Sequence, residues 1–464
     1  MAAASHKKIT SFHPPQRVLM GPGPSNINPR VLAAMSLPVI GYLDPAFVDM
    51  MAELKSLLRY AFQTDYQLTY PISGPGSVGM ESCFVNMVAP GDKVVVCRNG
   101  VFGGRMIENV ERCKATPIIV EGTWGEPVDP NALEDALKKN PDARVVAFVH
   151  AETSTGCVSD AKTLAEVAHK YDCLTIVDAV TSLAGCPLYV KDWDLDAVYS
   201  ASQKCLSCTP GLSPVTYSDR VIDYVTSRKD KVQSWFMDLN LILNYWGNTV
   251  RTYHHTAPIN GLFALHEALL LLKEEGIENT WARHQRHYQA LKAGFEAMGL
   301  KFLVKEENRL PQISAIMVPE GINEAEVRAK LLSEFNLEIG AGLGPLAGKI
   351  WRFGLMGYTA QSANVMLCLS ALGSVLSKMG YPVKVGEAEA AAHQSYANQH
   401  ASAAEEARSL LISLLILSNA RLFLSGVSFF FPLDTHYLQT HIIVSDQNRL
   451  SRLSNDQCSE SCPC

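Results

Sequence analysis

One lysine of this sequence has the surroundings of a nucleophile. Lys204 follows the short run Ala197–Tyr199 and is framed by serine, glutamine and cysteine rather than by charged residues. An amine in such surroundings is poorly solvated, so it is well placed to attack a carbonyl group and form a Schiff base. The residue types around Lys204 therefore point to covalent catalysis.

An aspartate ends a second apolar run. Asp178 follows Leu174–Val177, a pattern typical of a buried parallel strand that brings a carboxylate to its C-terminal end. Such a carboxylate can pair with the protonated pyridine nitrogen of pyridoxal phosphate, so that the ring acts as an electron sink. Spacing alone is equally compatible with a structural aspartate and a surface lysine, because many α/β proteins carry such residues.

Three further turns offer parts of a cofactor site. Ser73–Ser77 precedes a helix and presents backbone N–H groups that suit a phosphate, although turns of this kind are mostly structural. Phe102 follows the strand-like Lys93–Cys97 between glycines and can stack on an aromatic ring, while a core phenylalanine is the commoner case. His150–Gly156 ends another strand-like run and offers hydroxyl groups.

The elements around these residues alternate between strand-like and helix-like patterns. This alternation predicts an α/β fold with a mostly parallel sheet covered by helices, and ligands of such sheets bind at the carboxyl ends of the strands. The expected strands are Lys93–Cys97, Pro117–Val120, Val145–Val149 and Leu174–Val177, and the helices between them include Asp129–Lys139 and Ala161–Lys170.

The second part of the chain has a different pattern, with longer helices and few strands. It predicts a smaller α+β domain. The expected helices are Leu262–Glu275, Asn279–Met298 and Asn323–Phe335, and the expected strands are Gln312–Val318 and Ile350–Phe353.

Composition limits the class of protein. A chain of 464 residues exceeds the usual size of one hydrophobic core, so at least two domains are expected. The net charge of −6 argues against a nucleic-acid partner. The 12 cysteines lack the spacing of a metal site, and several fall within apolar runs, which favours a reducing compartment.

These segments, in this order, resemble the class V, fold-type I pyridoxal-phosphate aminotransferases, in particular the alanine–glyoxylate and serine–pyruvate aminotransferases. The resemblance covers about residues 15–380 and is more specific for the family than for the substrate. The matching stretches are Gly21–Ser25, Ser73–Ser77, Asn99–Gly103, His150–Gly156, Val177–Ser182, Ser200–Lys204, Tyr253–Thr256 and Gly342–Pro345.

The resemblance implies a role for each matching residue. Lys204 is the Schiff-base lysine and Asp178 is the partner of the pyridine nitrogen. Phe102 takes the place of the aromatic residue that stacks on the ring, and Thr153 approaches the phenolic oxygen of the cofactor. Arg352 matches the arginine that clamps the substrate carboxylate, a role that suits its planar fork of donors.

The resemblance also implies how the phosphate is held and how the chain assembles. Gly76, Ser77 and Gln203 contact the phosphate from within the chain. Tyr253 and Thr256 match residues that reach across a dimer interface to the phosphate of the neighbouring subunit. A homodimer with a shared active site is therefore expected.

Three residues depart from the pattern of the animal enzymes. Phe102 replaces a tryptophan and offers less stacking area. Pro75 stands where a serine is common and has neither a hydroxyl nor an N–H to donate, and Ser77 stands where those enzymes carry a histidine. We expect weaker cofactor binding or compensation by other donors, and the departures put the strict alanine–glyoxylate branch in doubt.

The expected function is a transaminase that moves an amino group from alanine or serine to glyoxylate or pyruvate in two half-reactions. Lys204, released by the substrate amine, acts as the general base that moves the substrate Cα proton. A 3-hydroxykynurenine transaminase or a serine–glyoxylate aminotransferase is the alternative on the same scaffold. An inactive paralogue that serves as a dimer partner is a second alternative, opposed by intact Lys204, Asp178 and Arg352.

The resemblance implies an N-terminal arm at 1–25, a large domain at 26–275, a small domain at 276–383 and an atypical, poorly ordered tail at 384–464. Within the tail, Glu387–Arg408 has the composition of a solvated helix or linker. The apolar runs Leu410–Leu417 and Leu422–Leu433 are interrupted by Arg421, which argues against a membrane span.

Neither end of the sequence contains a clear targeting signal. The first ten residues lack the apolar core of a signal peptide. Ser461–Cys464 is not a peroxisomal tripeptide of the Ser-Lys-Leu kind. A peroxisomal location is expected only because many family members have one, with the cytosol or the mitochondrion as alternatives.

Overall fold

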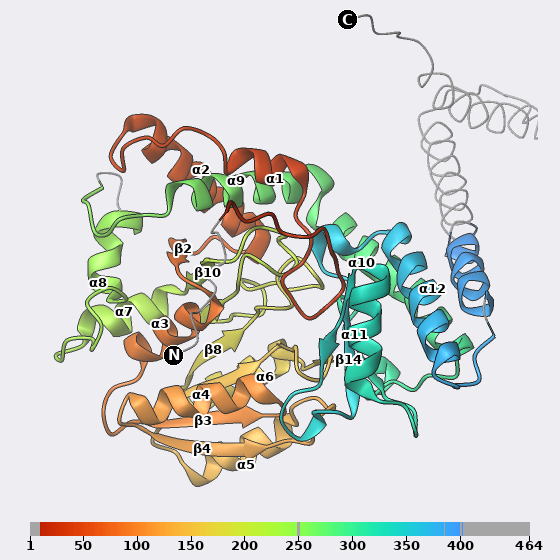
Figure 1. Cartoon of the computed structure of the whole chain (residues 1–464). Coiled ribbons are helices and arrows are strands. Elements are labelled where there is room, and N and C mark those ends of the chain that lie inside the picture. The colour runs from red at the N-terminus through yellow and green to blue at the C-terminus, as the bar shows by residue number, and fades with distance from the viewer. Residues whose placement is uncertain (1–9, 248–250, 385, 400, 402–464) are drawn as a thin grey trace, which may run out of the picture. The chain divides into compact units, whose positions relative to one another are not determined.

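A seven-stranded sheet forms the centre of the computed structural model, which describes residues 10–247, 251–384, 386–399 and 401 (Figure 1). The antiparallel strand β10 lies between β2 and β9, and the pairs from β9 to β4 are all parallel. In spatial order the strands are β2 (Leu68–Ser73), β10 (Leu212–Tyr217), β9 (Ala197–Tyr199), β8 (Leu174–Asp178), β5 (Ala143–Val149), β3 (Lys93–Arg98) and β4 (Thr116–Glu121).

Helices cover both faces of this sheet, as the alternating pattern predicts. Figure 1 shows α4 and α5 on either side of β3 and β4. Polar side chains cap several of these helices, for example Asp129 at α5 and Asp160 at α6. The helices are α2 (Pro45–Phe62), α3 (Gly76–Met87), α4 (Val101–Arg112), α5 (Pro130–Lys139), α6 (Ala161–His169), α7 (Asp219–Ser227) and α9 (Ile259–Glu275). The predicted α/β class is confirmed.

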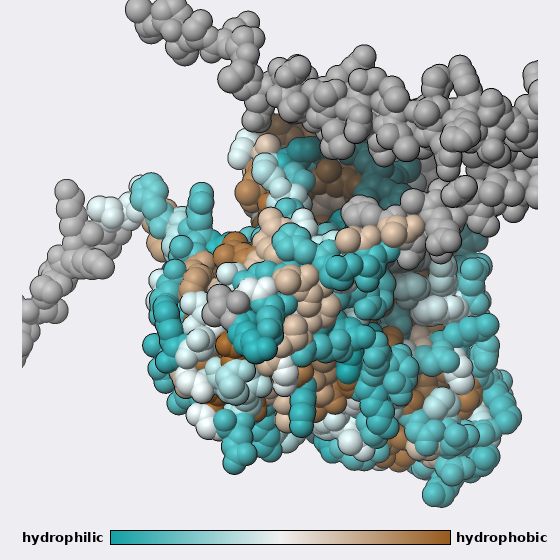
Figure 2. All heavy atoms as spheres, turned by 90° about the vertical axis from the view of Figure 1, so that its right-hand side faces the viewer, coloured by the Kyte–Doolittle hydropathy of each residue, from teal (hydrophilic) through white to brown (hydrophobic). Residues whose placement is uncertain are grey.

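A second hydrophobic core lies around a three-stranded antiparallel sheet. Its centre contains the fully buried aromatic rings of Phe295, Trp351 and Phe353. The sheet consists of β11 (Ile313–Met317), β14 (Ile350–Gly354) and β13 (Gly340–Ala341), and the helices are α10 (Ile277–Ala297), α11 (Glu324–Phe335) and α12 (Ser362–Lys378). In the face that Figure 2 presents, polar side chains predominate and apolar ones gather in small groups. The domain boundaries expected from the resemblance stay predictions.

The N-terminal segment connects this second core to the lysine loop. Strand β1 (Val18–Leu19) pairs in parallel with β12 (Leu337–Glu338). A few residues later, the Ser25 amide donates to the carbonyl of Gln203 over 2.9 Å. Gly23 has a φ of +110°, and a Cβ at this position would lie 2.6 Å from Nζ of Lys204, so only glycine fits beside the lysine.

Residues 387–399 are helical, but this helix is not the fully solvated one that the composition predicts. Ala388 and Ala392 are buried in the second core, and the Tyr396 hydroxyl lies 2.8 Å from Nδ1 of His287. Alanines four residues apart form one narrow apolar stripe, which the many polar residues of the segment conceal in the sequence. The apolar runs at 410–417 and 422–433 lie outside the described residues. None of the described helices is long and apolar enough to cross a membrane.

Replacing Ala392 with aspartate is expected to destabilise the protein by about 3 kcal/mol, because the substitution buries an unpaired charge. The matched control is Ala390→Asp on the exposed face of the same helix, which should leave the melting temperature almost unchanged. Thermal unfolding followed by circular dichroism measures both. Equal melting temperatures for the two variants would show that the 387–399 helix does not pack on the core.

Candidate active site

A cavity of about 210 Å³ lies where β8 and β9 end and helices α3 and α4 begin. Ligands of parallel sheets bind at this edge. The lining includes six of the ten residues that the sequence singles out: Gly76, Ser77, Phe102, Asp178, Gln203 and Lys204. The fold therefore brings together residues from four separate parts of the chain.

Lys204 is almost fully buried at this cavity. Its ammonium group donates a hydrogen bond to the Pro22 carbonyl of the N-terminal segment. Burial, with a further contribution from the positive charge of Arg352, lowers the pKa of Lys204 to about 8. A larger share of this amine is therefore unprotonated at neutral pH than for an exposed lysine, which favours attack on a carbonyl carbon.

Asp178 ends β8 with its carboxyl group at the cavity. One carboxylate oxygen accepts from the Val180 amide and the other from the Tyr199 hydroxyl, both over 2.8 Å. Burial raises the pKa of Asp178 to about 6, and these two hydrogen bonds oppose the rise. A buried carboxyl group of this kind can share a proton with a basic ring nitrogen.

The first turn of α3 provides donors for an anion. Helix α3 starts at Gly76 after Pro75, and no side chain caps it, so the amides of Gly76 and Ser77 have no partner within the helix. A Cβ at Gly76 would lie 3.0 Å from that of Ala201, so a larger residue would crowd this turn. The side-chain oxygen of Gln203 is buried without a hydrogen-bond partner. The amides of Gly76 and Ser77 fit the phosphate end of pyridoxal phosphate, while Lys204 and Asp178 fit its carbonyl and its ring nitrogen. The Gln203 oxygen is an acceptor, so this side chain would bind a phosphate only through its amide nitrogen.

Phe102 and Thr153 occupy different positions relative to the cavity. Phe102, in the first turn of α4, lines it, and the guanidinium of Arg105 lies 4.8 Å from the centre of the Phe102 ring. Thr153 is not among the lining residues. Its hydroxyl is hydrogen-bonded to that of Thr181, and its carbonyl accepts from Arg352.

Arg352 lies on β14 and is buried next to this cluster. Its Nε donates to the Ala341 carbonyl over 2.7 Å, and its Nη1 donates to the Thr153 carbonyl over 3.1 Å. Burial lowers the pKa of Arg352 to about 10, so the side chain stays positive at neutral pH. Within the described residues, no carboxylate forms an ion pair with it. A substrate carboxylate would supply the missing counter-charge.

Tyr253 and Thr256 do not line the cavity. The Tyr253 side chain is 53% exposed, and its hydroxyl lies 3.0 Å from that of Thr256. Neighbouring His255 contacts the Ser73 hydroxyl over 3.1 Å, which fixes this segment beside β2. The role of Tyr253 and Thr256 across a subunit interface stays a prediction.

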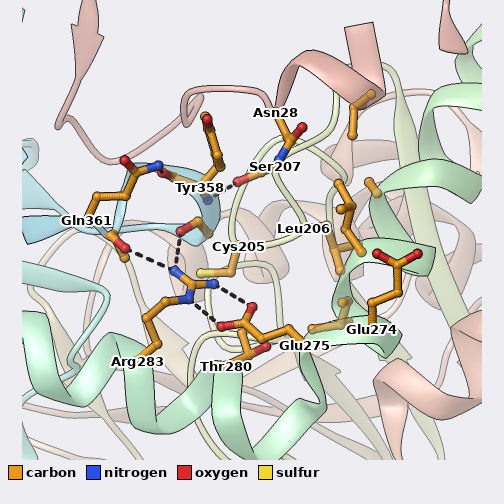
Figure 3. A pocket seen from close by; sticks show the side chains of 16 residues that line it. Asn28, Cys205, Leu206, Ser207, Glu274, Glu275, Thr280, Arg283, Tyr358 and Gln361 are labelled. Carbon is orange, nitrogen blue, oxygen red and sulfur yellow. Dashed lines mark hydrogen bonds and ion pairs between the residues drawn. The ribbon is translucent and has the colours of Figure 1, made fainter. Parts of the chain in front are cut away.

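The loop that follows Lys204 also contacts a second cavity. Residues Cys205–Ser207 form part of the wall of a second cavity, of about 490 Å³. Figure 3 shows the Ser207 hydroxyl facing the backbone of Tyr358, whose amide donates to it over 2.7 Å. On the same wall, Arg283 forms an ion pair with Glu275. The hydrogen bond from Tyr358 to Ser207 fixes the loop that follows the lysine.

Three residues near the cavity were missed by sequence reasoning. Tyr199 donates to Asp178, Arg105 lines the cavity, and Glu152 is buried between the turns that carry Phe102 and Thr153. Only the register between strands, which pairs Tyr199 with Asp178, makes the first contact visible. Among the described residues, no cluster of histidine, cysteine and carboxylate side chains could hold a metal ion.

Known proteins are similar to this chain over most of its length. The sequence profile described as "Aminotransferase class-V" matches residues 43–360. The (S)-ureidoglycine–glyoxylate transaminase of Bacillus subtilis is 38% identical over 84% of this chain and 98% of its own length. The alanine–glyoxylate aminotransferase of Mus musculus is 39% identical over 78% of this chain and 88% of its own.

A solved structure gives the same result. The alanine–glyoxylate aminotransferase of Nostoc sp. is 42% identical and superimposes with a TM-score of 0.78, covering 81% of this chain and 99% of its own. The match includes both the cofactor sheet and the second core. This chain belongs to the class V aminotransferases and is a pyridoxal-phosphate-dependent enzyme.

Proposed function

We propose that the enzyme transfers an amino group from a small amino acid, alanine or serine, to glyoxylate, with pyruvate as a second acceptor. The observation that carries this proposal is the burial of the Lys204 amine at the cavity together with a buried guanidinium, Arg352, that has no carboxylate partner among the described residues. Both named relatives use glyoxylate, and this supports the same acceptor here.

In this proposal, different residues bind the cofactor, bind the substrate and move the proton. Pyridoxal phosphate, when bound, supplies the reactive carbonyl group and the ring that takes up electrons. Asp178 keeps a proton on the ring nitrogen, and the Gly76 and Ser77 amides bind the phosphate. Arg352 orients the substrate carboxylate, so that its Cα proton faces the Lys204 amine, which removes the proton and returns it.

The similarity to the Bacillus subtilis enzyme favours a second candidate donor. That relative is named for (S)-ureidoglycine, and this chain covers nearly its whole length. Ureidoglycine has the same α-amino acid head as alanine, and Arg352 would bind its carboxylate in the same way. The two proposals differ only in the donor side chain.

A panel of amino donors with glyoxylate and with pyruvate tests these proposals. We expect the highest kcat/KM for alanine or serine with glyoxylate. A value about tenfold higher for ureidoglycine or for 3-hydroxykynurenine would replace the donor that we propose. Absence of turnover with every donor, in protein that binds pyridoxal phosphate, would support an inactive dimer partner instead.

We also propose a homodimer in which Tyr253 and Thr256 reach the phosphate of the partner subunit. Their absence from the lining of the cavity in their own chain and the exposure of Tyr253 support this arrangement. A subunit with Lys204→Ala carries an intact Tyr253–Thr256 segment, whereas a subunit with Tyr253→Phe and Thr256→Ala carries an intact lysine.

Mixing these two inactive or weakened homodimers under conditions of subunit exchange is expected to restore about a quarter of the wild-type activity. Half of the dimers would then be mixed, and each mixed dimer contains one good site. Activity is measured before and after exchange, and native mass spectrometry confirms the exchange. Complete exchange without recovery would contradict the shared site.

For the compartment, we propose the peroxisome, on the resemblance to alanine–glyoxylate aminotransferases alone. The net charge and the cysteine pattern are equally compatible with the cytosol. Fluorescence microscopy of the full chain with an N-terminal tag, compared with a peroxisomal marker, distinguishes the two. Diffuse fluorescence would exclude the peroxisome.

A further inference from the structure

Glu152 is a fully buried carboxylate for which the reaction described above has no use. It ends β6 (Ala151–Glu152), and its carboxylate accepts three hydrogen bonds. Oε1 accepts from the amide of Ser154 over 3.0 Å and from its hydroxyl over 2.6 Å, while Oε2 accepts from the Phe102 amide over 3.3 Å. No ion pair of Glu152 exists among the described residues, so these donors are what stabilise it.

The carboxyl group of Glu152 also packs directly against the turn that carries Phe102. A Cβ at Gly100 would collide with the Cγ and Cδ atoms of Glu152, so this glycine is required for the contact. The Val101 amide adds a hydrogen bond of 3.1 Å to the Ser154 hydroxyl. Glu152 and Ser154 together fasten the start of α4 to the 152–155 turn.

The same turn supports the substrate arginine. Thr153, between Glu152 and Ser154, accepts the Nη1 hydrogen bond of Arg352 through its carbonyl. Glu152 is also the carboxylate whose charge counteracts the effect of burial on the pKa of Arg352. One carboxylate is thus connected to the residue at the cofactor ring and to the residue for the substrate carboxylate.

The contacts of Glu152 are best satisfied by an ionised side chain. A carboxylate is an acceptor at both oxygens, whereas an amide or a protonated acid turns one of the two positions into a donor. That donor would face either the Phe102 amide or the Ser154 donors and repel them. Burial raises the pKa of Glu152 to about 7, and the hydrogen bonds from Ser154 and Phe102 oppose this rise and favour the carboxylate.

We propose that Glu152 is a positioning residue that holds Phe102 against the cofactor ring and, through the Thr153 carbonyl, holds Arg352 ready for the substrate carboxylate. The cofactor half of this proposal rests on the family, and the substrate half rests on the proposed function. The measurements below keep the two apart.

The test variant is Glu152→Gln, which keeps the shape of the side chain and removes its second acceptor. We expect the dissociation constant of pyridoxal phosphate and the KM of the amino donor each to rise about tenfold, with kcat changed by less than about threefold. The visible circular dichroism of the bound cofactor is expected to weaken, because Phe102 no longer fixes the ring. Cofactor binding and dichroism need no amino donor, so they test Glu152 even if the donor assignment fails.

The matched control is Asp196→Asn, which removes another fully buried carboxylate. Asp196 is hydrogen-bonded to His169, Arg220 and Ser218 and does not contact the cavity. This variant should lower the melting temperature while leaving both affinities within about twofold. If Glu152→Gln changes only the melting temperature, as Asp196→Asn does, Glu152 is merely structural and the proposal is wrong.

Two further variants extend the test. If Glu152→Gln does not fold, Ser154→Ala removes the hydroxyl that links Glu152 to the Val101 amide and should cause a smaller change in the same direction. The double variant Glu152→Gln with Arg352→Lys completes a double-mutant cycle. Its donor KM should rise by less than the product of the factors by which the two single substitutions raise it. Fully independent effects would overturn the connection to Arg352.

Discussion

Lys204→Ala is expected to reduce transamination by about four orders of magnitude or more, because one amine both forms the covalent link and moves the substrate proton. The variant should still bind pyridoxal phosphate, since the Gly76 and Ser77 amides and the Asp178 carboxylate remain. Steady-state turnover with glyoxylate measures the first effect, and equilibrium dialysis measures cofactor binding. Substantial residual turnover would show that another group carries the chemistry.

A surface lysine provides the matched control for this result. Lys191, half-exposed and paired with Asp65, should tolerate replacement by alanine with turnover within about twofold, since exposed ion pairs contribute little to stability. Stability gives a second readout. Removal of the Lys204 amine takes a poorly solvated charge out of the interior, so the melting temperature of the cofactor-free protein should not fall. A large loss of activity in Lys191→Ala would point to a general defect instead.

The sheet and the helices could be predicted because each of them repeats a pattern over its whole length. The expected strand Lys93–Cys97 corresponds to β3 and the expected helix Asn323–Phe335 to α11, within one residue at each end. The antiparallel direction of β10 was not predicted. Direction depends on how the chain connects the segment to its neighbouring strand, and the local sequence of Leu212–Tyr217 contains no signal for that.

The candidate site could be predicted where a residue ends a strand and has an unusual type for its position. Asp178 ends β8 and Lys204 lies in the loop that follows β9, and both line the cavity. Glu152 and Tyr199 were missed because their importance arises from contacts between segments far apart in the sequence. Glu152 lies in a hydroxyl-rich turn where a carboxylate is unremarkable, until the Phe102 amide, 50 residues away, is found to donate to it.

For the segment after residue 384, the sequence predicts a solvated helix, whereas part of the observed helix packs on the second core. Its composition is that of a solvated helix, because exposed positions outnumber buried ones on a helix that contacts the core along one edge. Ala388 and Ala392 make that contact. An alanine gives little indication of whether its position is buried, because alanine is also common on helix surfaces.

Arg352→Lys is expected to raise the KM of the amino donor by about 100-fold while the dissociation constant of pyridoxal phosphate changes by less than about threefold. The guanidinium uses Nε for the Ala341 carbonyl and Nη1 for the Thr153 carbonyl, which leaves a fork of N–H groups for a carboxylate. A lysine ammonium cannot serve both carbonyls and still present two parallel donors. It also loses its charge more readily when buried, whereas guanidinium stays protonated.

Two comparisons decide whether this effect belongs to the substrate. Arg328→Lys, on α11 and paired with Glu324, repeats the same substitution away from the cavity and should leave KM within about twofold. The acceptor oxo acid carries the same carboxylate as the donor, so its KM should rise by a similar factor in Arg352→Lys. If cofactor and substrate affinities fall together, or if only the donor is affected, Arg352 does not bind the carboxylate that both substrates share.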